Sequence, residues 1–281
     1  VHDEVHGFGA PGFKNLKGIQ KDFKFTLGLS ATPEREYDQD GTDFINEEIG
    51  SPIFEYPIES AIENGTLSPF RYHEIKVEQS DETSRKISAA ISAFNHKKKE
   101  NPNLPRKDLY TQIALIRSQD ENKIPSLRYF LKREGGKSLI KNSIIYCATK
   151  EQCKEVGPIL NELGFSFTYN FSENPAEQQK SLDELENNRI DTIINCHVLS
   201  EGIDIRSLEN IIMLHSWRAR LETIQRVGRC IRIDPNNPEK IANVVDLVLY
   251  KDIKTNDNIT SEIERRDWLL AVSQIREHKD G

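Results

Sequence analysis

The 281-residue sequence has no long hydrophobic run, a single methionine and only four cysteines. No stretch approaches the roughly 18 uninterrupted apolar residues of a membrane-spanning helix, and no secretory signal peptide opens the chain. We therefore expect a cytoplasmic protein without a membrane partner. The cysteines show no paired C-x-x-C spacing, and they lie in apolar or helical settings. We interpret them as small buried side chains in a reducing compartment, with disulfides or a zinc site as the alternative.

The sequence also lacks an excess of basic residues. Lys and Arg number 38 against 45 Asp and Glu, which gives a formal net charge of −7. This balance excludes a protein that coats nucleic acid through bulk charge, so any nucleic-acid contact must come from a local patch. With 36% hydrophobic residues the chain can bury a core, which argues against wholesale disorder.

The length fits about two domains of roughly 100–200 residues each. The only methionine is Met213, so Val1 is not a translation start and we expect the chain to be a piece of a longer protein.

The pattern of polar and apolar residues indicates four segments. Residues 1–58 are polar with one short run, Phe23–Leu29, that predicts a buried strand. Residues 59–136 read as a polar, mainly helical connecting segment with helices near 84–94, 109–117 and 124–133, and residues 251–281 as a tail with a charged closing helix.

Residues 137–250 alternate short β-rich apolar runs with helical patterns. Strands without polar alternation are buried on both faces, and strand–helix repetition is typical of a parallel sheet covered by helices. The sequence therefore predicts a doubly wound α/β domain. The expected strands are 143–148, 165–169, 192–196, 210–214 and 243–249, and the expected helices are 151–163, 176–187 and 221–231.

Two elements near the start of the chain carry candidate chemistry. In Asp3-Glu4-Val5-His6, one carboxylate can hold a hydrated magnesium ion while the next orients and deprotonates an attacking water. A solvated acidic turn is the simpler alternative. The run Leu27–Arg35 places the hydroxyls of Ser30 and Thr32 after the predicted strand, where they serve a site or merely cap the turn.

Two further elements lie in the α/β domain. Gly202 and Asp204 follow the strand near 192–196, where ligands of open α/β sheets bind, although an ordinary glycine turn has the same pattern. The strongest element is Gln225–Arg232. Arg229 and Arg232 are three residues apart, so a helix would place both on one face, and two guanidiniums suit phosphate oxygens. Gly228 leaves room for another surface beside them. The alternative is a solvated basic face.

In their order and spacing these four elements resemble motifs II, III, V and VI of superfamily 2 helicases, and residues 143–153 resemble motif IV. The sequence is similar to the DExH branch that holds restriction-enzyme translocating subunits and XPB-like DNA repair helicases. In that branch, a segment similar to Ala61–Phe70 also leads into the second domain. The resemblance covers about residues 1–70 and 141–250.

This resemblance implies a nucleic-acid-dependent ATPase, helicase or translocase with RecA-like domains of the P-loop NTPase fold. One complete RecA-like domain would span 137–250, and 1–58 would be the C-terminal part of the preceding one. ATP and Mg²⁺ would be the cofactors, with DNA as the nucleic acid and RNA as the alternative. By the same resemblance, Asp3 binds magnesium, Glu4 polarises water, and His6, Ser30 and Thr32 couple hydrolysis to nucleic acid.

The remaining roles also follow from the resemblance. Arg229 and Arg232 would reach the γ-phosphate and Gln225 would orient them. Gly202 and Asp204 would line the ATP cleft, and Thr149 and Ser200 would contact the nucleic-acid backbone.

The sequence departs from the family pattern in two places. Asn170-Phe171 stands where relatives often carry His-Gly, which puts a backbone-binding role there in doubt. The phosphate-binding loop G-x-x-x-x-G-K-[ST] is missing, because Glu134-Gly-Gly-Lys-Ser138 has Leu131 in place of the first glycine and precedes a strand. We therefore expect the P-loop half of the same protein upstream of Val1. A RecA-like module that binds nucleic acid or a partner without catalysis is the alternative function.

Overall fold

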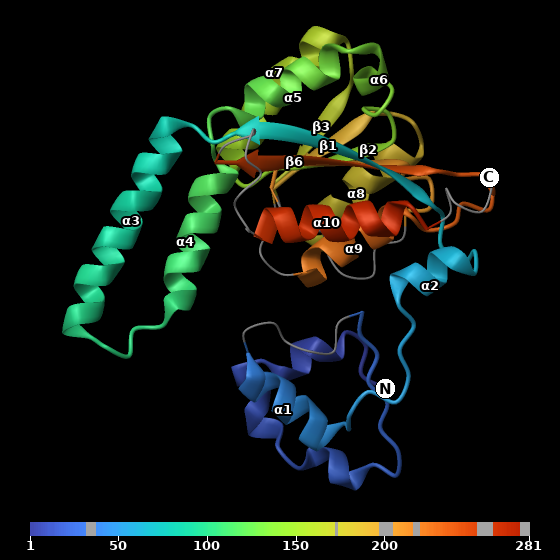
Figure 1. Ribbon diagram of the computed structural model, residues 1–281. Coiled ribbons are helices and arrows are strands. Elements are labelled where there is room, and N and C mark those ends of the chain that lie inside the picture. Colours follow the sequence, from blue (N-terminus) through green and yellow to red (C-terminus); the bar gives the residue numbers. More distant parts are fainter. Residues whose placement is uncertain (32–37, 172–173, 197–204, 216–219, 252–260, 276–281) are drawn as a thin grey trace. The chain divides into compact units, whose positions relative to one another are not determined.

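The structure is a computed structural model that describes residues 1–31, 38–171, 174–196, 205–215, 220–251 and 261–275. The chain forms two compact units, Val1–Pro57 and Ile58–Gly281. Figure 1 shows the second unit as a sheet with helices on both faces. Thr32, Ser200, Gly202 and Asp204, which the sequence marks as site residues, lie outside the described residues.

The Val1–Pro57 unit has a small apolar core made by Val5, Phe8, Phe44 and Ile45. Its helices are the 3-10 turns η1 (Val5–Gly9), η2 (Pro11–Leu16) and η3 (Ile19–Asp22), followed by α1 (Gln39–Glu48). The Asp38 carboxylate begins α1 by accepting a hydrogen bond of 3.0 Å from the Gly41 amide, an N-cap arrangement.

The prediction of a buried strand at Phe23–Leu29 is wrong. Among the described residues of this unit the backbone makes only an isolated parallel bridge between His2 and Gly28. The side chain of Phe25 is 84% exposed. A strand is buried when neighbouring strands and covering layers surround it, and the pairing with His2 alone supplies neither.

The described residues of the Ile58–Gly281 unit form a six-stranded sheet in the order β1-β6-β5-β2-β4-β3, with every adjacent pair parallel. All residues of the three short strands β2, β4 and β5 are buried, as expected for strands covered on both faces. The predicted α/β fold class is confirmed. The strands are β1 (Phe70–Glu78), β2 (Ser143–Tyr146), β3 (Phe167–Asn170), β4 (Thr192–Asn195), β5 (Asn210–Met213) and β6 (Ala242–Tyr250).

The helices divide between the two faces of this sheet (Figure 1). Helices α5 (Lys123–Lys132) and α7 (Lys150–Leu163) bury their apolar sides against one face. The other face is covered by α8, α9 and α10 together with Ile62 of α2. The bounds of the remaining helices are α2 (Ile58–Glu63), α3 (Asp81–Glu100), α4 (Arg106–Ser118), α6 (Glu134–Lys137), α8 (Pro175–Glu186), α9 (Arg220–Cys230) and α10 (Ser261–Ser273).

Residues 59–136 are mainly helical, as expected, but they also contain strand β1, which the sequence pattern did not predict. It pairs with β6 over its whole length, from Phe70 opposite Ala242 to Glu78 opposite Tyr250. It is an edge strand, and buried Ile75 and Val77 alternate with exposed Lys76 and Glu78. Polar residues are tolerated on such a half-covered strand, which is why its composition resembled the neighbouring helices.

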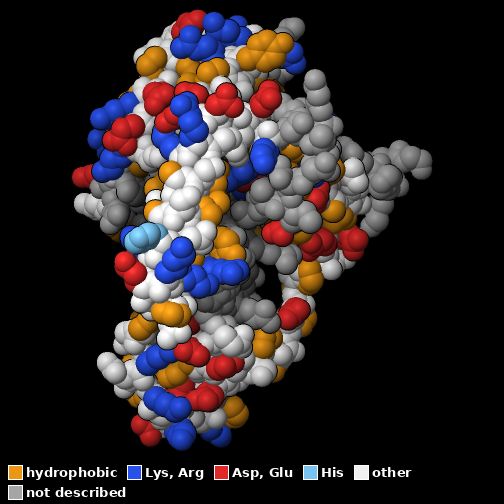
Figure 2. Space-filling view, turned by 60° about the vertical axis from the view of Figure 1, so that its left-hand side comes forward, with side chains coloured by type: hydrophobic (Ala, Val, Ile, Leu, Met, Phe, Trp, Pro, Cys, Tyr) orange, Lys and Arg blue, Asp and Glu red, His pale blue; other side chains and the backbone are white. Residues whose placement is uncertain are grey.

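Helices α3 and α4 form a hairpin that projects away from the sheet (Figure 1). The Ser80 hydroxyl caps α3 by accepting a hydrogen bond of 3.1 Å from the Thr83 amide. Ala90 and Phe94 are the buried apolar residues of α3. Figure 2 brings this hairpin to the front and shows basic and acidic side chains interspersed with scattered apolar ones over the same face.

The four cysteines are free thiols, three of them buried and Cys196 half-buried. Burial raises the pKa of Cys230 to about 12, so its thiol stays protonated and packs as a small apolar group. Within the described part of the chain, no helix is both long enough and apolar enough to cross a bilayer.

Candidate functional site

The structure brings Glu4, His6 and Ser30 together within the Val1–Pro57 unit. His6 Nδ1 lies 3.1 Å from Ser30 Oγ and 3.3 Å from Glu4 Oε2. Backbone hydrogen bonds fix this arrangement, because Leu29 donates to the His2 carbonyl and Val5 donates to the Leu29 carbonyl. Two segments that the sequence marked separately therefore form one cluster.

The backbone at Glu4 has a conformation that non-glycine residues rarely adopt. Its φ of 48° and ψ of 49° lie in the left-handed region, at the N-cap of η1. The Asp3 Oδ1 atom accepts a hydrogen bond of 3.0 Å from the Glu4 amide and so helps to hold this turn. Left-handed residues of this kind cost about 1–3 kcal/mol and cluster at functional sites, which fits the role expected for Glu4.

Asp3 is the residue that could hold a magnesium ion. Its side chain is exposed, and Mg²⁺ commonly takes one or two carboxylates while it keeps several waters. Among the described residues no group of three or more His, Cys, Asp or Glu could enclose a metal. A metal at Asp3 would therefore depend on water and substrate oxygens for its other ligands.

Helix α9 carries the strongest sequence element, with one correction. Arg229 is buried and Gln225 half-buried on this helix, but α9 ends at Cys230, so half-buried Arg232 lies in the following turn. The predicted shared helical face for the two arginines is therefore wrong. The buried ammonium of Lys240 donates to the carbonyls of Arg232 and Arg206, each at 2.8 Å, and this holds the chain in the turn.

Arg226 is a residue of this element that sequence reasoning missed. Its Nη1 donates a hydrogen bond of 2.6 Å to the His215 carbonyl, and its guanidinium carbon lies 4.3 Å from the ring centroid of Tyr146. The side chain is buried. No signal in the sequence marked it, because its role depends on the Tyr146 ring and the His215 carbonyl, which meet it only in the folded chain. It joins α9 to the ends of β2 and β5.

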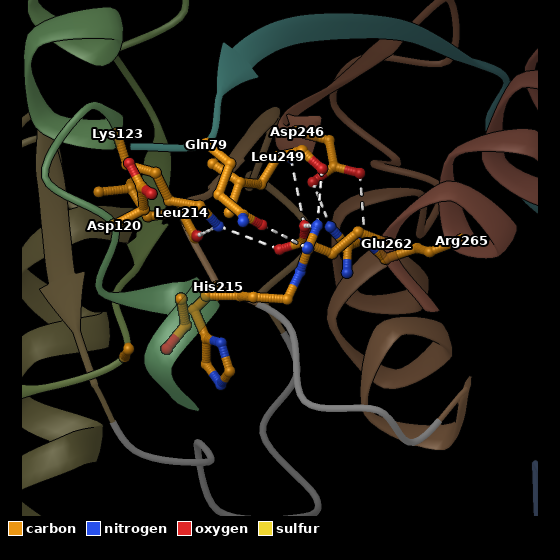
Figure 3. A network of polar contacts seen from close by, with 12 residues as sticks. Gln79, Asp120, Lys123, Leu214, His215, Asp246, Leu249, Glu262 and Arg265 are labelled. Atoms are coloured by element: carbon orange, nitrogen blue, oxygen red, sulfur yellow. Dashed lines mark hydrogen bonds and ion pairs between the residues drawn. The ribbon is translucent and has the colours of Figure 1, made fainter. Parts of the chain in front are cut away.

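A second buried cation acts on the neighbouring carbonyl. The ammonium of Lys123 is fully buried and donates to the Leu214 carbonyl at 2.8 Å and to Glu262 Oε1 at 3.1 Å (Figure 3). Consecutive carbonyls at the carboxyl end of β5 are thus bound by Lys123 from α5 and by Arg226 from α9. The strand end that leads toward α9 is fixed from two sides.

Glu262 is the anionic centre of this network. It accepts hydrogen bonds from Lys123, from Arg117 at 3.2 Å and from the Leu249 amide at 3.2 Å. Burial alone would raise the pKa of its carboxyl, but Lys123, Arg117 and Arg265 outweigh that effect and lower the pKa to about 2. The carboxylate therefore remains charged at neutral pH.

Asp246 of β6 forms the other half of the network in Figure 3. Arg265 of α10 binds it through two hydrogen bonds of 2.8 and 3.0 Å, and the Tyr72 hydroxyl donates a third at 3.1 Å. Burial, followed by the charge of Asp246, raises the pKa of Tyr72, so the phenol keeps its proton. These contacts anchor α10 to β1 and β6.

His215 is buried beside these cations. Burial lowers the pKa of its imidazole well below the usual value, and the charges of Arg226, Lys123 and Arg265 lower it further. The ring is therefore neutral at pH 7. Figure 3 places His215 at the side of the network, next to Leu214.

Thr149 has a structural role that the sequence did not predict. It is the N-cap of α7, where its hydroxyl accepts a hydrogen bond of 3.2 Å from the Gln152 amide. The contact of Thr149 with a nucleic-acid backbone stays a prediction.

The stretch Glu134–Lys137 forms the short helix α6 ahead of β2, so it is not a phosphate-binding loop. A Cβ at Gly136 would overlap the carbonyl oxygen of Phe130, and this close approach accounts for the glycine.

Residues 122–234 match the helicase conserved C-terminal domain family. The matched region runs from the buried network at Lys123 to the turn after α9, and it includes Gln225, Arg229 and Arg232. A viral protein named as helicase 22, from the Sulfolobus islandicus filamentous virus, is 23% identical over 93% of this chain and 45% of its own length. The chain spans less than half the length of the curated relatives it matches.

Two solved structures share the fold. The Hef helicase domain of Pyrococcus furiosus is 13% identical with a TM-score of 0.50, over 95% of this chain and 72% of that one. A fragment assigned as the HsdR subunit of a type I restriction enzyme from Vibrio vulnificus is 19% identical with a TM-score of 0.50, over 78% and 39%. The fold is thus that of RecA-like helicase domains, and the helicase domain match supports a helicase-type function.

Proposed function

We propose that this chain is part of a nucleic-acid-dependent ATPase motor of superfamily 2, a helicase or translocase of the DExH type. The observation that carries the proposal is the contact of His6 with both Glu4 and Ser30. It joins the Asp3–His6 element to the Leu27–Arg35 element, 24 residues away, as the coupling of hydrolysis to nucleic acid requires. The helicase domain match over 122–234 adds support from the second unit.

The acids near the start of the chain would act on the hydrolytic water. Asp3, which is exposed, would hold the Mg²⁺ that neutralises phosphate charge when ATP is bound. Glu4 would orient the water and take its proton. His6 touches Glu4, so a shift of its side chain would pass to Ser30 through their 3.1 Å contact. Thr32 belongs to the same proposed coupling group.

The arginines of the second unit would act on the phosphate. Arg229 and Arg232 would stabilise charge on the γ-phosphate in flight, a contribution of about 10³–10⁵ in rate in such enzymes. Gln225 would orient them, and Arg226 would hold α9 in place through the His215 carbonyl. Gly202 and Asp204 would line the ATP cleft.

The domain assignment belongs to the same proposal. Residues 1–58 would be the C-terminal part of the first RecA-like domain, and the P-loop would lie in the upstream half of the same protein. Residues 137–250, completed by β1, would be the second RecA-like domain, joined through the helices of 59–136 and closed by the tail of 251–281. DNA is the proposed nucleic acid, contacted by Thr149 and Ser200 in a sequence-independent, salt-sensitive way.

ATP hydrolysis by the longer protein, with and without DNA, tests this function. We expect DNA to stimulate hydrolysis and Arg232→Ala to reduce the stimulated kcat by at least about a hundredfold. Arg128→Ala is the matched control, because Arg128 is an exposed arginine that pairs with Glu162 at 3.7 Å. Full stimulated activity in Arg232→Ala would overturn the role assigned to this arginine.

Glu4→Gln separates catalysis from binding. It keeps the size of the side chain and removes the carboxylate, so we expect hydrolysis to be lost while DNA binding persists. If the longer protein binds DNA and never hydrolyses ATP, the chain belongs instead to a non-catalytic RecA-like binding module.

A further inference from the structure

We propose that the tip of the α3–α4 hairpin, residues 96–108, binds the phosphodiester backbone of a nucleic-acid duplex. The proposed function supplies the class of partner, and the hairpin adds a contact surface outside the site described above. The tip joins the end of α3 to the start of α4, and no predicted site residue lies on it.

The tip concentrates positive charge in an acidic chain. It carries Lys97, Lys98, Lys99, Arg106 and Lys107 against Glu100 and Asp108, a balance of five cations to two anions in a protein of net charge −7. Lys97, Lys99 and Arg106 are exposed and Lys98 is half-buried. Glu100 is paired with His96 at 3.8 Å, and in the described part of the chain Lys97, Lys98, Lys99 and Arg106 form no ion pair.

The other end of α3 behaves differently. There Arg85 and Lys86 both pair with Glu82, at 3.0 and 3.5 Å. The same helix therefore has matched charges at its base and unmatched cations at its tip. If α3 simply exposed a charged face to solvent, we would expect its paired and unpaired charges to be spread more evenly along the helix.

Stabilisation of the hairpin itself does not account for the cluster. Cations in the last turn of α3 do interact favourably with the helix dipole. Arg106 and Lys107, however, begin α4, and there the dipole disfavours cations. The α3–α4 hairpin brings the two groups to the same end. An anionic ligand at this end would offset the unfavourable interaction of the α4 cations with the helix dipole.

The hairpin is held firmly at its base. The Ser80 amide donates to Asp120 Oδ2 at 2.9 Å, and Arg117 at the end of α4 donates to the Leu249 carbonyl at 2.7 Å and to Glu262. A 20-residue helix is about 30 Å long, so the tip lies far from this anchor. Figure 1 shows the arm standing clear of the sheet, and Figure 2 shows blue side chains gathered toward its far end.

The chemistry of the tip favours a duplex over a single strand. Single-strand sites combine a basic groove with aromatic rings on which bases stack. The sequence from Lys97 to Asp108 contains no Phe, Tyr or Trp. A duplex carries one negative charge per about 1.7 Å of its axis, so a protruding group of cations can neutralise several phosphates at once.

The test measures binding of this chain to a short DNA duplex by fluorescence anisotropy over about 50–200 mM salt. Replacing Lys97, Lys98 and Lys99 together by Gln is expected to reduce duplex affinity at least about tenfold at the low-salt end. The slope of log affinity against log salt should fall by about 0.9 for each lost phosphate contact, hence by about 2–3. Arg85→Gln with Lys86→Gln is the matched control on the same helix and should leave both quantities unchanged.

Arg106→Gln separates binding from folding. It removes a cation from the dipole-disfavoured start of α4, so binding should weaken while the thermal midpoint stays equal or rises. An RNA duplex should show the same loss in the triple variant, and a single strand of the same sequence a smaller one. The proposal is overturned if the triple variant keeps the wild-type salt slope, or if the wild-type chain fails to bind a duplex. Neither result bears on DNA-stimulated ATP hydrolysis by the longer protein, which tests the proposed function separately.

Discussion

The guanidinium of Arg226 lies over the ring of Tyr146, 4.3 Å from its centroid, while Nη1 of the same side chain donates to the His215 carbonyl at 2.6 Å. Tyr146 ends β2, His215 follows β5, and Arg226 belongs to α9. A single buried side chain therefore joins the helix that carries Gln225 and Arg229 to two adjacent strands.

We expect Arg226→Met to destabilise the Ile58–Gly281 unit by about 2–4 kcal/mol. A hydrogen bond to a charged group contributes about 1.5–3 kcal/mol, and a desolvated cation–π contact about 2 kcal/mol. Urea denaturation followed by tryptophan fluorescence measures the loss, since both tryptophans of the chain belong to this unit. Tyr146→Phe keeps an aromatic face and should cost less than Arg226→Met; an equal cost would contradict the stacking contribution.

Lys123→Met is expected to cost about 3–5 kcal/mol. The change leaves Glu262 with one buried cation fewer and removes the donor of the Leu214 carbonyl. Lys132→Met is the matched control on the same helix, because Lys132 pairs with Glu162 at 2.8 Å near the surface and such pairs contribute about 0–1 kcal/mol. Similar denaturation midpoints for the two variants would show that the buried network is dispensable.

The stability of this unit should fall as the pH drops below about 6.5. The folded chain keeps His215 neutral because the pKa of its imidazole is well below the ordinary 6.5, whereas the unfolded chain takes up a proton there. The contribution is complete above pH 6.5 and declines by at most about 1.4 kcal/mol per pH unit below it. Replacing His215 by Asn should flatten this decline in pH-dependent urea titrations, and replacing exposed His96 by Gln should not.

Gly228→Ala should have opposite effects on stability and activity. A Cβ at Gly228 would meet no atom within 4 Å, so alanine should stabilise α9 by about 0.5–1 kcal/mol. If another surface approaches the arginines at this glycine, ATP hydrolysis by the longer protein should fall. Gly157→Ala is the contrast, because its Cβ would overlap the hydroxyl oxygen of Tyr169, so the Tyr169 ring would have to move and we expect a smaller gain in stability or a loss. An active, stabilised Gly228→Ala protein would refute the close approach.

Local composition explains which strands were predictable. The runs at β2, β4 and β5 contain consecutive isoleucines that are buried on both faces, a pattern that few other structures require. Strand β1 was missed because His73, Glu74 and Lys76 interrupt its apolar residues. These polar residues are tolerated because β1 is an edge strand, and the position of a strand at the edge is a property of the assembled sheet and not of the segment.

The predicted site residues were likewise recognisable only where the local sequence carried the signal. The Asp3–His6 and Leu27–Arg35 elements were recognisable from residue types, and the structure joins them through His6 and Ser30. Lys123 gave no such signal, because its partner Glu262 lies 139 residues further along the chain. A buried lysine is identifiable only once the counterion is in place, so long-range ion pairing remains beyond what one sequence reveals.

The pairing of residue 70 with residue 242 has a consequence for how the protein is made. During synthesis β1 leaves the ribosome long before β6 exists, and at about 5–20 residues per second the delay is of the order of 10–30 s. Through that interval Ile75 and Val77 lack the strand beside them, and the edge of β1 is open to other chains. The last strand to emerge completes the sheet, so a stalled or shortened product would expose its first strand to aggregation and to chaperones.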